Sequence, residues 1–133
     1  MKLIIVLTGL LLGSLAQAES GKALVEIVEE YYERHHALSK PVASEKDIDK
    51  IFELFSDDFV YIHEGYGGEY SRQRIYQGYV RNFQGGRYKD DLQKHKIAKY
   101  VVGLNMVALT RVDGKTTLYE FRDGKIKTIK EYW

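Results

Sequence analysis

Hydrophobic and polar positions follow a helical period in the first part of the chain. Between positions 23 and 38, apolar or aromatic residues recur three to four positions apart, as on a helix with one buried face. These residues are Leu24, Ile27, Val28, Tyr31, His35 and Leu38. Glutamate and arginine fill the positions between them. The segment is therefore predicted to be an amphipathic helix that ends before Pro41, since proline lacks the backbone N–H that a helix interior needs.

Two shorter helices are predicted from their N-caps and their apolar spacing. Ser44, with Asp47 three positions later, resembles a capping box. Ser71 is the expected N-cap of a further helix, which ends at Gly85-Gly86. The apolar positions are Ile48, Ile51, Phe52 and Phe55 in the first of these helices, and Ile75, Tyr79 and Phe83 in the second.

The remaining segments have the period and composition of strands. Residues 59–63 are rich in β-branched and aromatic side chains, and a glycine-rich turn follows at 65–68. From His95 to Trp133 the pattern predicts three or four strands, with Asp113-Gly114 and Asp123-Gly124 as hairpin turns. This order of elements indicates the α+β class, with one strongly curved antiparallel sheet wrapped around about three helices.

Length and charge narrow the possible functions. The chain has 133 residues, with 20 Lys and Arg against 19 Asp and Glu, and no cysteine. This length predicts a single domain. The near-zero net charge argues against nucleic acid as a partner, because binding to phosphates needs a surplus of basic side chains. Without disulfides, the fold must be stable through its core alone.

Residues 1–18 have the pattern of an export signal. Lys2 provides the positive start, residues 3–12 form an apolar run, and Ala16-Gln17-Ala18 matches the small-x-small cleavage pattern. We expect cleavage after Ala18, which leaves a domain of residues 19–133 in the periplasm or the medium, without membrane attachment. A membrane anchor is the weaker alternative, because a spanning helix needs about 20 apolar residues.

Two segments resemble a known superfamily. Residues 51–59, which lead from a helix through Asp57-Asp58 into a strand, are similar to the NTF2-like superfamily, as are residues 121–126 and 131–133 at the closing hairpin. Within it, the chain resembles the SnoaL-like and ketosteroid-isomerase-like groups. The resemblance implies a conical fold with a ligand pocket between helices and sheet, and often a homodimer through the outer sheet face. The superfamily hosts enzymes and non-catalytic members alike.

The resemblance also suggests positions for chemistry. Tyr31 falls at the oxyanion-hole tyrosine of the isomerases, His63 at their general base and Thr117 at their second, protonated acid. Only Tyr31 matches in residue type. The missing acid disfavours steroid-type isomerisation, since one oxyanion donor contributes about 10²–10³ in rate.

The residues themselves support a polar spot within an apolar pocket. The imidazole of His63 exchanges protons near neutral pH, and strand alternation places it on the same face as Phe59 and Tyr61. We therefore expect Tyr31 and His63 as catalytic candidates. The ligand-binding candidates are Phe59, Tyr61, His95, Thr117 and Tyr119. Tyr31 and His63 are equally compatible with hydrogen-bonded core positions, and a solvent-exposed His95 is the simpler alternative.

Other motifs have plainer interpretations. Glu120 and Glu131 lie beside basic residues and are predicted to form surface ladder pairs, with a role as inward-facing bases held in reserve. His63-Glu64 lacks a second histidine four positions after the first, and the adjacent His35 and His36 point in different directions on a helix. The sequence therefore predicts neither a metal site nor a cofactor.

Three hypotheses for the function follow. The first is an exported domain that binds a small, mostly apolar molecule in its pocket. The second is a cofactor-independent lyase or isomerase of the dehydratase type that uses His63 and Tyr31. The third is a protein-interaction or assembly domain that uses the outer sheet face. Whether the protein catalyses a reaction stays open at this point.

Overall fold

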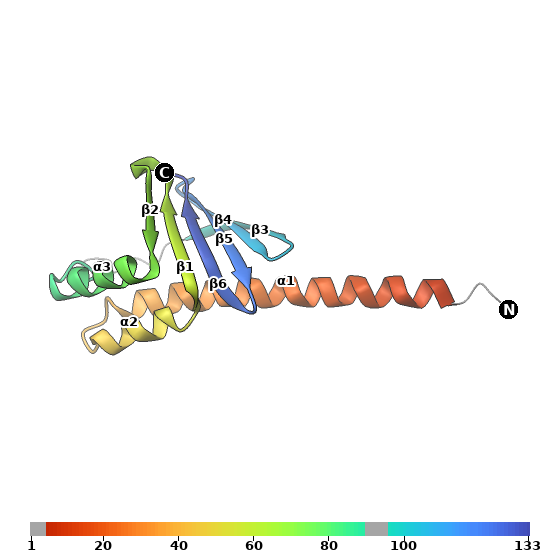
Figure 1. Ribbon diagram of the computed structural model, residues 1–133, viewed down its shortest axis with the longest axis horizontal. Helices are drawn as coiled ribbons and strands as arrows, with labels where there is room; N and C mark the ends of the chain where they lie inside the picture. Colours follow the sequence, from red (N-terminus) through yellow and green to blue (C-terminus); the bar gives the residue numbers. More distant parts are fainter. Residues whose placement is uncertain (1–4, 90–95) are drawn as a thin grey trace.

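The structure is a computed structural model that describes the backbone of residues 5–89 and 96–133, with side chains from residue 21 onward. It contains three α-helices, a short 3₁₀-helix and six strands (Figure 1). In chain order these are α1 (Ile5–Ala37), α2 (Glu45–Phe52), β1 (Phe55–His63), η1 (Glu64–Tyr66), β2 (Gly68–Ser71), α3 (Arg72–Gln84), β3 (Ile97–Gly103), β4 (Met106–Arg111), β5 (Thr116–Arg122) and β6 (Lys125–Glu131).

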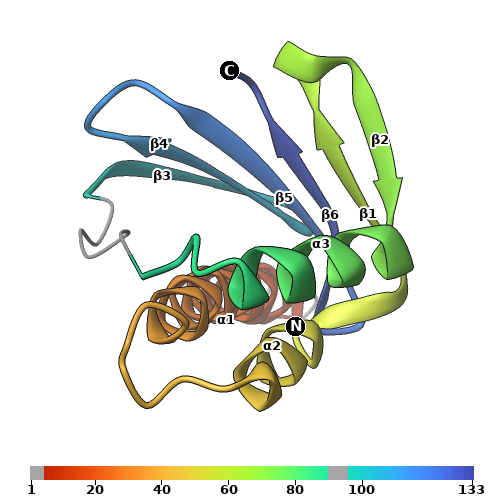
Figure 2. The same cartoon turned by 90° about the vertical axis from the view of Figure 1, so that its left-hand side faces the viewer.

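The six strands form one curved sheet in the order β2-β1-β6-β5-β4-β3. Figure 2 shows the sheet arching over the helices, with its concave side toward them. The predicted α+β fold is confirmed. The sheet is antiparallel except where β1 and β6 pair in parallel, with Tyr61 opposite Ile129 and His63 opposite Glu131. This pair joins the first strand of the chain to the last, and it positions most of the site described below.

The predicted helices are present, and the first is longer than expected. The second ends at Phe52, so Phe55, which was predicted to lie on its apolar face, is instead the first residue of β1. α1 begins at Ile5 rather than near residue 23, and Figure 1 shows its N-terminal part projecting past the sheet. The Asp47 carboxylate accepts the Ser44 N–H at 2.9 Å at the start of α2. The Ser71 hydroxyl accepts the Arg74 N–H at 3.3 Å at the start of α3. Within the described part of the chain, no helix is long and apolar enough to cross a membrane.

The four strands of the second half are joined by tight turns. Asp123 and Gly124 both have positive φ, 52° and 72°, as a two-residue hairpin of this type requires. Between β3 and β4, Asn105 takes φ 54°, a conformation that asparagine tolerates better than most residues. The predicted meander is confirmed and contains four strands.

The core lies between the concave face of the sheet and the helices. Its most completely buried aliphatic residues come from both layers: Val28, Leu38, Ile48, Ile51, Val107, Leu109 and Ile126. Burying such a side chain contributes about 1.5–3 kcal/mol. This packing fixes the position of α1 and α2 against the sheet.

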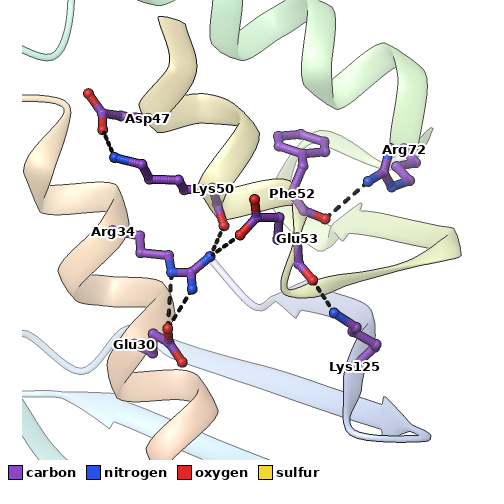
Figure 3. A network of polar contacts seen from close by, with 8 residues as sticks. All are labelled: Glu30, Arg34, Asp47, Lys50, Phe52, Glu53, Arg72 and Lys125. Carbon is purple, nitrogen blue, oxygen red and sulfur yellow. Dashed lines mark hydrogen bonds and ion pairs between the residues drawn. The ribbon is translucent and has the colours of Figure 1, made fainter. Parts of the chain in front are cut away.

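A polar network outside the core ties the helices together (Figure 3). The Arg34 guanidinium on α1 donates to the Glu30 carboxylate at 2.6 Å, to the Glu53 carboxylate at 3.2 Å and to the Lys50 carbonyl. It therefore links α1 to the end of α2. Nearby, Arg72 on α3 donates to the Phe52 carbonyl at 3.0 Å. These contacts link the three helices to one another, and Lys125 of β6 adds a bond from the sheet to the Glu53 carbonyl.

Candidate functional site

A cavity of about 270 Å³ lies between the helices and the sheet. Two helices and two strands supply most of its wall, namely α1, α3, β1 and β6. Its lining residues are Tyr31, His35, Phe55, Phe59, Tyr61, Ile75, Gly78, Tyr79, Asn82, Tyr88, Ile129 and Glu131. Most of these are aromatic or apolar, and the polar groups are few, which is the usual composition of a small-molecule site.

The sheet register brings several candidates from the sequence onto one face. His63, Glu131 and Thr117 lie side by side across β1, β6 and β5. Two positions away on each strand, Tyr61 pairs with Ile129, which pairs with Tyr119. Side chains two positions apart on a strand share a face, so both rows of paired residues point to the same concave side.

Glu131 and Tyr61 form the polar end of the cavity. The Tyr61 hydroxyl donates to the Glu131 carboxylate at 2.5 Å, and both residues line the cavity. Burial raises the pKa of the Glu131 carboxyl above its ordinary value, and the Tyr61 hydrogen bond and nearby His63 oppose this shift. Burial, together with the bond to Glu131, also raises the pKa of Tyr61. The tyrosine therefore stays protonated and acts as a donor.

A second polar pair lies where α1 faces α3. The hydroxyl oxygens of Tyr31 and Tyr79 are 3.1 Å apart. Burial raises the pKa of both phenols, so neither ionises near neutral pH. The sequence prediction that Tyr31 faces the pocket agrees with this geometry. One hydroxyl of the Tyr31–Tyr79 pair donates to the other, so this pair has one proton to spare for a guest molecule.

His63 is buried beside the cavity and is not among the residues that line it. The Tyr66 ring stacks on its imidazole at a centroid distance of 4.1 Å, and Trp133 lies edge-on at 5.9 Å. Its Nδ1 accepts the Tyr66 N–H at 3.3 Å, so in the neutral ring the proton is on Nε2. This Nε2 lies 3.7 Å from the Glu131 carboxylate. His63 thus contacts the site through Glu131.

Of the other candidates from the sequence, Tyr119 and Thr117 are not among the residues that line the cavity. Phe59 lines it and stacks on Phe55 with ring centroids 4.0 Å apart. Tyr119 is buried, and its ring centroid lies 6.0 Å from that of Tyr31. Thr117 is buried next to Glu131, and its hydroxyl has no hydrogen-bond partner among the described residues. His95 lies outside the described residues.

The surface ladder pair predicted for Glu131 from its neighbour Lys130 is wrong. The carboxylate faces the cavity and is largely covered, which is the inward-facing alternative that was held in reserve. The alternation of β6 contains the signal that was missed: Glu131 is two positions after Ile129, which is buried. Glu120, the other glutamate, is exposed as predicted.

His35 and Tyr88 are further lining residues that the sequence did not single out as functional. His35 belongs to the apolar face of the first helix, where periodicity indicates only burial. In the structure its ring packs edge-on against Tyr79 at 5.7 Å and Tyr88 at 5.5 Å. In the described part of the chain, no group of three or more His, Asp or Glu side chains is placed to hold a metal ion.

Comparisons with known proteins show what this arrangement is similar to. No protein-family model matches the sequence, and no curated protein matches it significantly. Solved structures do match. An NTF2-like protein of unknown function from Burkholderia xenovorans LB400 aligns over 84% of this chain and 82% of its own, at 15% identity and a TM-score of 0.58.

Two further structures carry the ketosteroid-isomerase name. The first is a putative ketosteroid isomerase from Kribbella flavida, which aligns over 85% of this chain and 78% of its own, with 11% identity and a TM-score of 0.56. The second is a protein with a ketosteroid-isomerase-like fold from Catenulispora acidiphila, solved with trimethylamine. It aligns over 81% of this chain and 85% of its own, with 17% identity and a TM-score of 0.52.

The chain has the NTF2-like fold. The resemblance drawn from residues 51–59 and from the closing hairpin is therefore confirmed at the level of fold. In this NTF2-like chain the cavity lies between the curved sheet and α1 and α3, and its polar end is the Tyr61–Glu131 pair.

Proposed function

We propose that the protein is an exported NTF2-like domain that binds a small, mostly apolar molecule in the cavity between α1, α3, β1 and β6. A fold shared with ketosteroid-isomerase-like proteins supports a ligand-binding or isomerase-like domain. The observation that carries the proposal is the cavity itself, about 270 Å³ in volume and walled mainly by aromatic rings. The Tyr61–Glu131 and Tyr31–Tyr79 pairs would orient the guest.

The proposal is tested by filling the cavity from α3. Gly78 lines the cavity, and a Cβ atom built there meets no atom closer than 4.0 Å. Gly78→Ala is therefore tolerated, whereas Gly78→Phe adds a ring at the wall. We expect 2-naphthol, followed by its fluorescence, to bind the wild type, and Gly78→Phe to weaken binding at least tenfold.

Gly78→Ala is the matched control for this experiment and is expected to change the dissociation constant less than about twofold. It also removes a helix-interior glycine, which costs about 1 kcal/mol relative to alanine. Equal affinity in all three proteins would contradict binding in this cavity, because the added ring would then not compete with the probe.

A second candidate function is a cofactor-independent lyase or isomerase, and the position of Glu131 favours it. The sequence suggested His63 and Tyr31 for this chemistry. A cavity carboxylate whose pKa burial raises is a better-placed base than the covered imidazole, and Tyr31 would donate to an oxygen on which charge develops. In this scheme His63 is a positioning residue, with its Nε2 3.7 Å from the Glu131 carboxylate.

Proton abstraction can be measured without knowing the substrate. We expect the protein to accelerate deuterium uptake next to the carbonyl of phenylacetone in heavy water, followed by NMR. Glu131→Gln should abolish the acceleration, and Tyr31→Phe should reduce it by about 10²–10³. A rate equal to that of buffer alone would eliminate this second candidate and leave binding in place.

The export part of the proposal is supported by residues 1–18 and has its own test. Mass spectrometry of protein recovered outside the cytoplasm should show a mature chain that begins at Glu19. Recovery of the uncut chain, still beginning at Met1, would contradict it.

A further inference from the structure

The charges that face the cavity are unevenly distributed. Among the described residues, Glu131 is the only acidic residue of the lining, and neither lysine nor arginine belongs to it. Tyr61 and His63 both lie against Oε2 of Glu131. No hydrogen bond within the described part of the chain reaches the other carboxylate oxygen. Glu131 therefore presents an acceptor to whatever occupies the cavity.

The cationic side chains that surround Glu131 are engaged elsewhere. Arg111 pairs with Asp113 at 2.5 Å, and the Lys115 ammonium lies over the Trp133 ring, 5.4 Å from its centroid. The His63 Nε2 is 3.7 Å from the Glu131 carboxylate, which is longer than a hydrogen bond. Among the described residues, no lysine or arginine lines the cavity beside the Glu131 carboxylate, and His63 approaches it no closer than 3.7 Å.

The walls favour a positive charge as well. Aromatic rings carry negative charge on their faces and attract a cation within about 6 Å of the ring centre. Six tyrosine or phenylalanine rings line this cavity: Tyr31, Phe55, Phe59, Tyr61, Tyr79 and Tyr88. A carboxylate at one end of a space walled by aromatic rings is the arrangement that recognises an ammonium group attached to an apolar body.

We propose that the ligand of this cavity is a small organic amine, bound as its cation, with the ammonium on Glu131 and its apolar part against the tyrosine and phenylalanine rings. This inference rests on the proposed binding function and names the class of its ligand. A neutral hydrophobic guest of the same size would bring no positive charge to Glu131, and an anion would be repelled by it.

The test compares three probes of nearly the same size on the full-length mature protein at pH 7. Benzylamine is a cation, benzyl alcohol is neutral and benzoate is an anion. By isothermal titration, we expect benzylamine to bind about tenfold more tightly than benzyl alcohol and benzoate to bind more weakly than either. Glu131→Gln should remove the preference for the amine. Glu120→Gln makes the same charge change at an exposed position of the neighbouring strand and should preserve the preference.

The outcomes separate the two proposals. Equal or tighter binding of benzyl alcohol or of benzoate by the wild type would overturn the amine assignment and leave the binding function intact. A preference for the amine that persists in folded Glu131→Gln would overturn the role of Glu131. No binding of any probe would contradict the proposed binding function itself. The wild-type comparison needs no variant, so it decides the matter even where Glu131→Gln does not fold.

Discussion

The Glu131 carboxylate accepts a hydrogen bond from the Tyr61 hydroxyl at 2.5 Å, although the two residues are 70 positions apart in the sequence. The parallel pairing of β1 with β6 makes this contact possible, since it sets His63 opposite Glu131 and Tyr61 opposite Ile129. Both partners line the cavity. The polar end of the site therefore depends on the one parallel pair in the sheet.

Glu131→Gln should change how stability depends on pH. Burial raises the pKa of this carboxyl above 4.5 in the folded protein, so the folded state binds its proton more tightly than the unfolded state does. This contribution to stability is fully present below the unfolded pKa and is lost as the pH rises through the folded pKa. The free energy of unfolding of Glu131→Gln minus that of wild type should therefore be larger at pH 7 than at pH 4.

Urea denaturation of both proteins at the two pH values measures this difference. The matched control is Glu120→Gln, whose side chain is exposed and whose stability relative to wild type should not follow pH in this way. A difference between Glu131→Gln and wild type that is the same at pH 4 and pH 7 would contradict the burial of an ionising carboxyl at this position.

Thr117→Val should stabilise the fold by about 1 kcal/mol. The Thr117 side chain is 1% exposed, and its hydroxyl has no hydrogen-bond partner among the described residues. Valine has nearly the same shape and removes the cost of a buried, unpaired hydroxyl. Thermal or urea unfolding measures the change. A loss of stability would mean that the hydroxyl is bonded, and a loss of probe affinity would return Thr117 to the binding site that the sequence suggested.

Arg34→Ala should destabilise the protein by about 1–2 kcal/mol. The Arg34 guanidinium joins α1 to α2 through Glu30, Glu53 and the Lys50 carbonyl, and its side chain is only 26% exposed. A network of this kind contributes more than an isolated surface ion pair.

Lys22→Ala is the control for Arg34→Ala. Lys22 pairs with Glu26 at 3.9 Å, and both side chains are largely exposed, so its removal should change the free energy of unfolding by less than about 0.5 kcal/mol. Equal effects of the two substitutions in urea titrations would show that the link between α1 and α2 does not contribute.

Arg122→Gln should raise the pKa of Asp58. Hydrogen bonds from Arg122 and from Ser56 hold the pKa of this carboxyl at about 2, against an ordinary 3.8. Because the folded pKa is depressed, the stabilisation is present above pH 3.8 and is lost as the pH falls toward 2. Carbon NMR of the carboxyl groups follows the titration. A pKa near 2 that persists in Arg122→Gln would assign the shift to another group.

Local patterns predicted the elements of this fold well. Helical spacing between 23 and 38, the caps at Ser44 and Ser71 and the Asp-Gly turns each act over a few residues, so the sequence displays them directly. The parallel contact between β1 and β6 joins distant segments and leaves no local trace. The upstream extent of α1 was also missed, because the apolar run of residues 3–12 matches an export signal and has no polar face.

The candidate site was predicted in part for the same reason. Alternation placed Tyr61 and His63 on one strand face, and the structure agrees. Whether His63 reaches the cavity depends on Tyr66 and Trp133, which cover its ring from a neighbouring turn and from the end of the chain. For Glu131, the prediction followed the charge of the neighbouring Lys130, although the alternation of β6 with buried Ile129 indicated the inward face. The roles of Tyr31 and His63 in catalysis stay predictions.

The most direct test of ligand binding in the cavity is fluorine NMR of protein labelled with fluorotyrosine, titrated with benzylamine. Tyr61, Tyr79 and Tyr88 line the cavity, whereas Tyr66 is 81% exposed outside it. We predict saturable shifts of the cavity tyrosines, assigned by single Tyr→Phe variants, while the Tyr66 resonance stays in place. Shifts confined to Tyr66 or to other exposed tyrosines, with the cavity resonances unmoved, would contradict the account.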